Sequence, residues 1–240
     1  MNPRDTFDKV SLSCISYLES FEECEALDFQ SKDGLSSHEI ALWEKKNTPY
    51  ILPGDLKSFY SMFNGFYLGW NIKLDDQLVT VGEMRVNALA DIQRVPIDGT
   101  FEMNKQMSDG GMVNSADLKS YVAFTLDSLS EVGQIVMLYR PNPHSQQADT
   151  ANGGGRQVIN NLNDQYENPE IWFLDVSARW HFLCPTFTNF VRLMVTHLGI
   201  HGWQSAFTPE GLSPTTQQWM QMFCKERLVV DLHAHEQPSR

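Results

Sequence analysis

Cysteine, basic side chains and long apolar runs are all scarce in this sequence. Only four of its 240 residues are cysteines, at positions 14, 24, 184 and 224. They are too sparse for a disulfide framework, and no two have zinc-finger spacing, so we expect free, mostly buried thiols in a reducing compartment. No run approaches the ~20 apolar residues of a membrane span. Residues 1–5 contain no apolar signal region. We therefore expect a cytoplasmic protein with no membrane contact.

Basic residues are outnumbered by acidic ones. The chain has 18 Lys and Arg against 30 Asp and Glu, a formal net charge of −12 and a pI near 4.9. A surface this acidic repels phosphate backbones, which argues against a nucleic-acid partner. It also repels acidic proteins, so any acidic partner would have to be contacted through a local basic patch or through another subunit.

The apolar residues predict one α+β domain. They make up 42% of the chain, enough for a sizeable core, and no linker separates two periodic halves. Residues 170–175 are apolar or aromatic at both alternating sets of positions, which predicts a strand covered on both faces. A second strand is expected over 180–183. The next helix has one apolar face, made by Phe187, Phe190, Val191, Met194, Val195 and Leu198.

The rest of the chain predicts helices and antiparallel strands around this centre. We expect helices over 6–21, over 37–46 with a capping box of Ser36 and Glu39, from Pro53 to Gly65, and from Pro214 onward. Strands are expected over 66–74, 77–86, 121–127 and 133–140, with a turn at residues 75–76 between the first two. Residues 28–34 read as a turn, 87–118 as a long loop and 141–169 as a disordered insertion.

These elements predict three segments. Residues 1–34 would form an N-terminal helix and turn, 35–223 the domain itself, and 224–240 a polar tail that frays.

Candidate catalytic and metal-binding groups are few. Cys184 lies near His181 and could form a nucleophile–base pair, but apolar neighbours favour a buried strand and no third orienting group is evident. His197 and His201 have a metal-compatible spacing, yet Gly199 breaks the helix between them, and His197 is better placed to cap it. The glycines at 153–155 lack the ending of a phosphate loop. We therefore expect no catalytic, cofactor or metal site.

Tryptophan offers a binding hypothesis in place of a catalytic one. Six tryptophans are many for 240 residues, and core packing explains most of them. The alternative is that some of these aromatic residues form a partner-binding hot spot. The candidate partner-binding residues are Trp180, His181, Trp203 and Phe207.

Two sets of residues in this sequence resemble known protein families. Leu52-Pro53, Phe59-Tyr60 and Asn64-Gly65-Phe66 resemble the SUKH superfamily, which includes the yeast cell-wall-assembly regulator and bacterial toxin-immunity proteins. That resemblance implies N-terminal helices, one mostly antiparallel sheet and C-terminal helices. A sharper likeness is to the family of tubulin polyglutamylase complex subunit 2. It is carried by Glu170-Ile171-Trp172-Phe173-Leu174-Asp175, Trp180-His181-Phe182-Leu183, Thr196-His197-Leu198-Gly199, Trp203-Gln204 and Ala206-Phe207-Thr208.

The second resemblance implies a non-catalytic scaffold or targeting subunit. Its expected partners are a tubulin-tyrosine-ligase-like glutamylase, which would carry the activity, and other subunits of that complex. Tubulin and microtubules would be reached indirectly, and the protein would locate to the microtubule cytoskeleton. The first resemblance leaves an alternative open, a stand-alone SUKH-type module that binds and regulates another protein or acts as an immunity protein.

Overall fold

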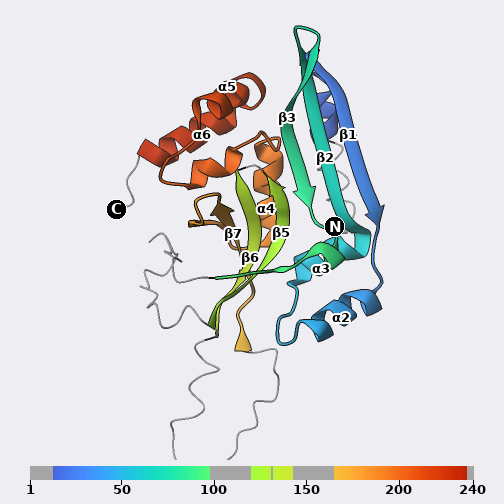
Figure 1. Cartoon of the computed structure of the whole chain (residues 1–240). Coiled ribbons are helices and arrows are strands. Elements are labelled where there is room, and N and C mark those ends of the chain that lie inside the picture. Colours follow the sequence, from blue (N-terminus) through green and yellow to red (C-terminus); the bar gives the residue numbers. More distant parts are fainter. Residues whose placement is uncertain (1–12, 98–119, 131, 143–164, 237–240) are drawn as a thin grey trace, which may run out of the picture.

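Two antiparallel sheets form the framework of the chain (Figure 1). The computed structural model describes residues 13–97, 120–130, 132–142 and 165–236. The first sheet has the order β1-β2-β3 and the second the order β4-β5-β6-β7-β8. The bounds are β1 Cys24–Asp33, β2 Phe63–Leu74, β3 Gln77–Val86, β4 Arg94–Val95, β5 Val122–Ser130, β6 Gly133–Tyr139, β7 Glu170–Asp175 and β8 Trp180–Cys184. The expected α+β class is confirmed.

The single sheet expected from the SUKH resemblance is wrong, and the outer edge of β3 gives the reason. That edge is already paired with the segment that follows the helix at 187–196. The Glu83 amide donates to Gly199 O at 2.8 Å, and the His201 amide donates to Val81 O at 3.0 Å. With these backbone groups occupied, the later strands assemble a second sheet.

Local sequence signals account for most of the helices. They are α2 Ser37–Lys46, α3 Gly54–Met62, α4 Phe187–Thr196, α5 Pro214–Phe223 and α6 Lys225–Glu236, with the short 3₁₀ helices η1 Leu89–Asp91 and η5 Trp203–Phe207. The capping box of Ser36 and Glu39 is present, and Ser213 caps α5. Residues 13–18 are helical, as expected for the end of the first helix, whereas 6–12 lie outside the described residues.

The end of α3 differs from the expectation. Asn64 and Gly65 do not close the helix, because the chain passes directly into β2 at Phe63. Gly65 has φ +85°, and a Cβ there would lie 2.7 Å from the Ala88 nitrogen. Glycine is therefore needed for a close backbone approach inside the sheet.

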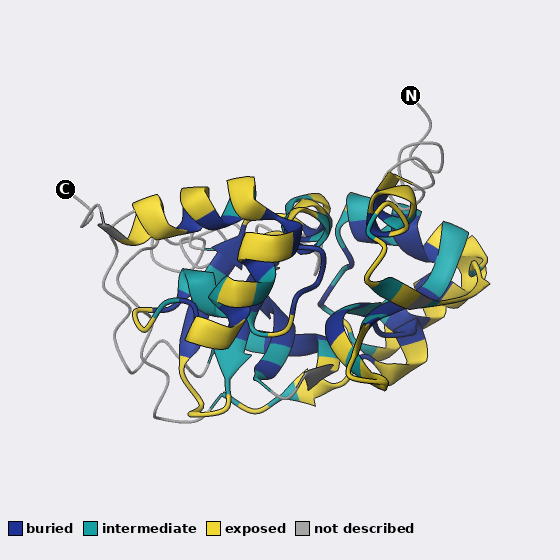
Figure 2. Ribbon diagram, turned by 90° about the horizontal axis from the view of Figure 1, so that it is seen from above, coloured by how far each residue is buried: buried dark blue, intermediate teal, exposed yellow. Residues whose placement is uncertain are grey.

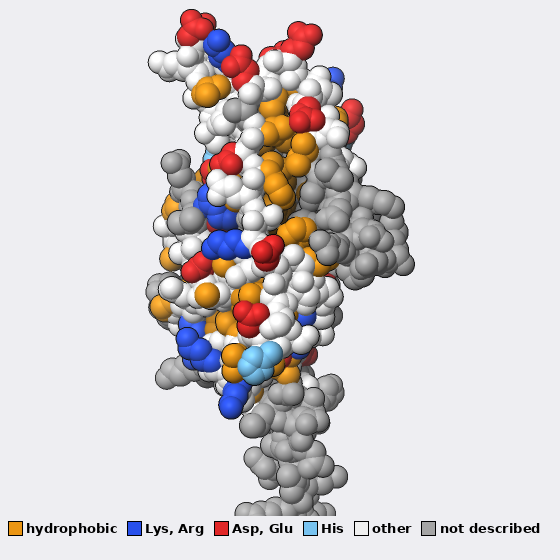
Figure 3. Space-filling view, turned by 90° about the vertical axis from the view of Figure 1, so that its right-hand side faces the viewer, with side chains coloured by type: hydrophobic (Ala, Val, Ile, Leu, Met, Phe, Trp, Pro, Cys, Tyr) orange, Lys and Arg blue, Asp and Glu red, His pale blue; other side chains and the backbone are white. Residues whose placement is uncertain are grey.

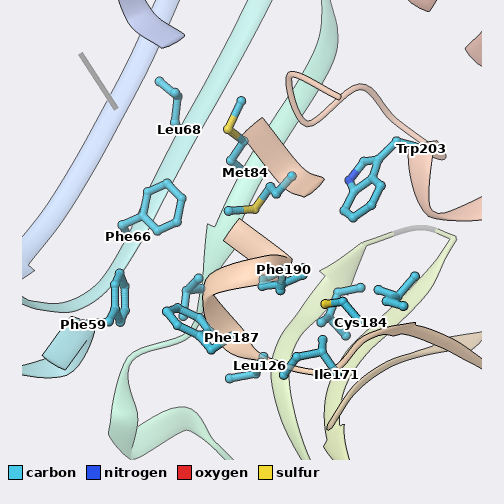
Figure 4. Close-up of a cluster of buried hydrophobic side chains, with 14 of the residues drawn as sticks. Phe59, Phe66, Leu68, Met84, Leu126, Ile171, Cys184, Phe187, Phe190 and Trp203 are labelled. Carbon is cyan, nitrogen blue, oxygen red and sulfur yellow. The ribbon is translucent and has the colours of Figure 1, made fainter. Parts of the chain in front are cut away.

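The main core lies between the two sheets and includes one face of α4. Figure 4 shows Phe187 and Phe190 of α4 with Phe66 of the first sheet on one side and Ile171 of the second on the other. The Phe59 and Phe187 rings are 5.1 Å apart, which joins α3 to the same core. Figure 2 shows buried residues in the interior and exposed residues on the outer faces of the helices. The apolar stripe of α4 therefore packs as its spacing predicts.

Strand β7 is covered on both faces, as expected. Ile171 and Phe173 belong to the main core, whereas Trp172 between them belongs to a second cluster with Trp180 on the opposite face. All four side chains are at most 2% exposed. This explains why the strand shows no polar alternation.

The turn expected over residues 28–34 is wrong, because most of that segment belongs to β1. Its backbone pairs with β2 from Leu27 opposite Trp70 to Asp33 opposite Phe63. The side chains of this strand are largely exposed, so its sequence shows polar residues rather than an apolar period. Pairing with β2 decides the conformation here, not local propensity.

The fraying tail expected after residue 223 is also wrong. Residues 225–236 form α6, in which Leu228 and Asp231 are 5% and 3% exposed. A polar residue takes one of the core positions, so the pattern reads as solvated although the helix packs. The division into segments 1–34, 35–223 and 224–240 stays a prediction.

The two loop predictions can be followed only in part. Residues 87–97 contain η1 and the short strand β4, and 98–118 lie outside the described residues. Within the expected insertion 141–169, Pro141 and Tyr166 form a β-bridge, while 143–164 lie outside the described residues. In the part of the chain that the structure describes, no helix is both long enough and apolar enough to span a bilayer.

Candidate functional site

The proposed pair of Cys184 and His181 has no reactive thiol. Cys184 is 4% exposed at the end of β8, and its Sγ donates to Thr186 O at 3.5 Å. Burial raises the pKa of this thiol to about 12, so it stays protonated at neutral pH. A low-pKa nucleophile at this position is therefore contradicted. The expectation of free, mostly buried thiols is confirmed, because all four cysteines are free and only Cys24 is not buried.

His181 belongs to a charged cluster at the turn between β7 and β8. Its Nε2 lies 3.0 Å from Asp175 Oδ2, which also accepts a hydrogen bond from Arg179 Nε at 2.9 Å. Arg179 in turn pairs with Glu210. Asp175 Oδ1 accepts from the backbone amides of Ser177 and Arg179, which shapes the turn.

The protonation of Asp175 follows from these contacts. Partial burial alone would raise the pKa of its carboxyl. Hydrogen bonds from the Arg179 backbone and from His181, together with the Arg179 charge, outweigh burial and lower the pKa. The ionised carboxylate therefore stabilises the turn.

Trp180 and His181 face opposite sides of their sheet, as adjacent residues of a strand must. Trp180 packs in the second cluster with Trp172, and His181 lies near the Phe173 ring of the main core, at 6.1 Å. Each is 2% exposed. The two side chains cannot serve one contact surface together.

Trp203 is held inside a network that joins α4, η5 and α6. Its ring stacks on His197 at a centroid distance of 4.6 Å. His197 Nδ1 donates to Leu193 O at 2.6 Å, and its Nε2 lies 3.0 Å from Asp231 Oδ2 and 3.1 Å from Arg227 Nε. Arg227 also pairs with Asp231. His197 does cap α4, as expected, and this network further fastens α6 to the helix end.

Phe207 is the one candidate of the four that is not fully buried. It is partly buried and packs edge-on against Trp203 at 6.2 Å. Of the four candidates, only Trp203 and Phe207 are in ring contact with each other. Because no partner is present, partner binding stays a prediction. Burial of the other three side chains explains their aromatic character without a partner.

Two hollows on the surface were not foreseen from the sequence. The first is an open apolar groove of about 670 Å³, lined by Cys14, Tyr17, Val195, Leu198 and Val230 among others. The second is a polar pocket of about 310 Å³ on the three-stranded sheet, lined by residues such as Lys32, Asn64, Tyr67, Arg85, Asn87 and Asp91. Both combine residues far apart in the chain, which single-sequence patterns do not bring together.

Metal binding has no support in the described ranges. No group of three or more His, Cys, Asp or Glu side chains there has the geometry to hold a metal ion. His197 of the proposed pair with His201 is fully buried in the network with Asp231.

Comparison with known proteins gives a clear set of relatives. The chain is 31% identical over 236 residues to human "Tubulin polyglutamylase complex subunit 2", a match that covers 90% of this chain and 69% of the human protein. The rat and mouse proteins of the same name are each 31% identical over 223 residues, covering 90% of this chain and 71% of theirs. No protein-family model matches the chain, so the SUKH resemblance stays a prediction. No solved structure matches it significantly.

Proposed function

The chain belongs to the family of tubulin polyglutamylase complex subunit 2, and we propose that it is a non-catalytic subunit that scaffolds or targets a tubulin polyglutamylase complex. A tubulin-tyrosine-ligase-like glutamylase would supply the activity, and tubulin would be reached mainly through the other subunits. The protein would then act in the cytoplasm, on the microtubule cytoskeleton. The observation that carries this proposal is 31% identity to the human protein across 90% of the chain.

The ionisable side chains in the described residues support a non-catalytic role. The candidate nucleophile Cys184 has a raised pKa, and the carboxylate of Asp175 is engaged in its turn. A buried polar network around His197 and Asp231 joins secondary-structure elements to one another. These groups stabilise the fold, which is what a binding subunit requires.

Affinity purification from native cells tests the proposal. The tagged full chain should retain a tubulin-tyrosine-ligase-like enzyme near stoichiometrically, and the purified chain alone should add no glutamate to tubulin. A clean purification without such an enzyme, dominated by an unrelated protein, would overturn the proposal and favour a stand-alone binding module. Glutamylation of tubulin by the chain alone would contradict its non-catalytic character.

A matched pair of variants tests the partner role of Phe207. Phe207→Ala should release the partner enzyme if this ring is a contact residue, because contact hot spots are enriched in aromatic side chains. Trp219→Ala is the control, since Trp219 is also partly buried and packs against the same core. Equal retention by both variants would remove Phe207 from the interface. Trp203→Ala is unsuitable, because Trp203 is 2% exposed and its loss would disturb the core.

A further inference from the structure

The polar pocket on the three-stranded sheet is built on the face opposite the core. Gln30, Tyr67 and Arg85 stand directly across β1, β2 and β3 from one another, so their side chains share one face. Their neighbours Phe66 and Val86 point into the main core instead. The pocket has a volume of about 310 Å³, which suits one side chain with its flanking backbone rather than a long segment.

Arg85 is presented to this pocket in a fixed orientation. Its guanidinium lies 4.9 Å from the centre of the Tyr67 ring, and the Tyr67 hydroxyl donates to Glu83 Oε1 at 2.8 Å. Tyr67 can lie in this position because residue 69 is glycine: a Cβ there would be 2.3 Å from the Tyr67 hydroxyl oxygen. Glu83 is 3.8 Å from Arg85, beyond hydrogen-bond distance. The planar donors of Arg85 are therefore held in place and still open to an acceptor.

Other donors line the same pocket. Lys32 is exposed and forms no ion pair with any residue in the described ranges. Asn87 is 9% exposed, and its amide nitrogen is buried without a hydrogen-bond partner among the described residues. Asn64 Oδ1 accepts from the Leu89 amide at 2.9 Å, which leaves its own amide group as a donor. The lining thus offers two cationic groups and two side-chain amides, an arrangement suited to binding an anion.

Asp91 limits the kind of anion that this pocket can bind. Asp91 also lines the pocket, so the charged lining residues Lys32, Arg85 and Asp91 sum to a single positive charge, and Glu83 pairs with Arg85 from outside the lining. Figure 3 shows Lys and Arg side chains beside Asp and Glu side chains on one face of the molecule. The Asp91 carboxylate repels a phosphate dianion more strongly than a singly charged carboxylate, and the charge of the latter matches the sum over the lining residues. Asp91 can in turn accept a backbone N–H, which a peptide ligand offers and a free inorganic ion does not.

We propose that this pocket binds a glutamate or aspartate side chain of an acidic peptide. Arg85 and Lys32 bind the carboxylate, and Asp91 accepts a hydrogen bond from the peptide backbone. The choice of a glutamate-rich peptide rests on the proposed function, whereas the carboxylate chemistry rests on the pocket itself. The strongly acidic chain would thereby have the local basic patch that any acidic partner requires.

Titration of the full chain with defined probes tests this inference by calorimetry or by NMR. The first probe is a short blocked peptide of alternating glutamate and glycine, and the second replaces every glutamate with glutamine. We expect binding of the glutamate peptide only, weakened by added salt. Free glutamate and inorganic phosphate serve as further probes, and both should bind more weakly than the peptide. Equal binding of the glutamine peptide, or tighter binding of phosphate, would overturn the proposal.

Two substitutions test whether the glutamate peptide binds in this pocket. Arg85→Gln should weaken binding about tenfold or more, because it removes a charged hydrogen-bond donor. Lys32→Glu reverses an exposed charge without disturbing the core, and should also weaken binding. Lys73→Gln is the control, since Lys73 is an exposed lysine of the same sheet that pairs with Asp76 and does not line the pocket.

The variants also separate this inference from the proposed function. Unchanged affinity in both Arg85→Gln and Lys32→Glu would refute the pocket even if the complex still co-purifies. Loss of peptide binding with full retention of the glutamylase would support the pocket as a site distinct from the subunit interface. Absence of any binding by the wild-type chain at physiological salt would also overturn it.

Discussion

The packing of α6 can be tested through its buried carboxylate. Asp231 has a side chain that is 2% exposed and lies between His197 and Arg227. Asp231→Ala removes the carboxylate that both basic side chains contact. Removal of one partner from a buried ion pair costs about 3–5 kcal/mol.

The cost for Asp231 should fall at the low end of that range. The Arg227 side chain is 24% exposed, so water can solvate part of its charge. We therefore expect a loss of about 3 kcal/mol in the free energy of unfolding. For a chain of this size, this corresponds to a decrease of roughly 6–12 °C in Tm.

Urea unfolding followed by tryptophan fluorescence and circular dichroism would measure this loss. Val229→Ala on the same helix is the control, because Val229 is 43% exposed and its truncation should change stability by about 0.5 kcal/mol or less. Hydrogen exchange of residues 225–236 provides an independent readout. Equal stability of Asp231→Ala and wild type, with unprotected amides in this segment, would show that α6 does not pack and would refute the reasoning.

Three further predictions follow from local geometry. In native protein at pH 8, a thiol reagent should modify Cys24 well before Cys184. Burial raises the pKa of Cys184 to about 12, whereas Cys24 is less buried. Rapid modification of Cys184 would contradict this prediction. Gly199→Ala should destabilise by about 2 kcal/mol, since φ is +61° and the new Cβ would lie 2.5 Å from a backbone oxygen. Gly54→Ala, with nothing within 4 Å of the Cβ, should be neutral or slightly stabilising in the same denaturation assay. Folding lowers the pKa of Asp175, so the ionised carboxylate adds to the free energy of unfolding above about pH 4, and this contribution is lost as the pH falls through the folded-state pKa. Wild type and Asp175→Asn should therefore become equally stable at acid pH. A stability difference that stays constant with pH would refute this.

Elements defined by local periodicity could be predicted from the sequence. The stripe of α4 from Phe187 to Val195 required only a 3.6-residue repeat, whereas Leu198 lies beyond the end of the helix at Thr196. The hairpin of β2 and β3 required two strand patterns and a turn, and Asp75 and Asp76 do take positive φ values of 46° and 66° there. In each case the signal and the structure lie within one short segment.

Elements defined by distant partners could not be predicted. Strand β1 is held by its pairing with β2, about forty residues away, and its exposed side chains show no apolar period. Helix α6 buries Asp231, whose partner His197 is 34 residues earlier in the sequence. A carboxylate in a core position looks like a solvated residue until its partner is known.

The candidate site shows the same limit. Trp203 and Phe207 could be selected as aromatic residues, but the sequence does not show that Trp203 is stacked on His197 in the interior. The polar pocket brings Lys32 of β1 together with Arg85 of β3, and each looks in isolation like an ordinary surface charge. Only the cross-strand register places them together.

The most direct test of the proposed function is mass spectrometry of the tagged chain purified from its native cells. The account predicts near-stoichiometric recovery of a tubulin-tyrosine-ligase-like glutamylase, together with tubulin glutamylation by the purified complex and none by the chain alone. Recovery of the intact chain without any such enzyme, under conditions in which the glutamylase is expressed and soluble, would contradict it.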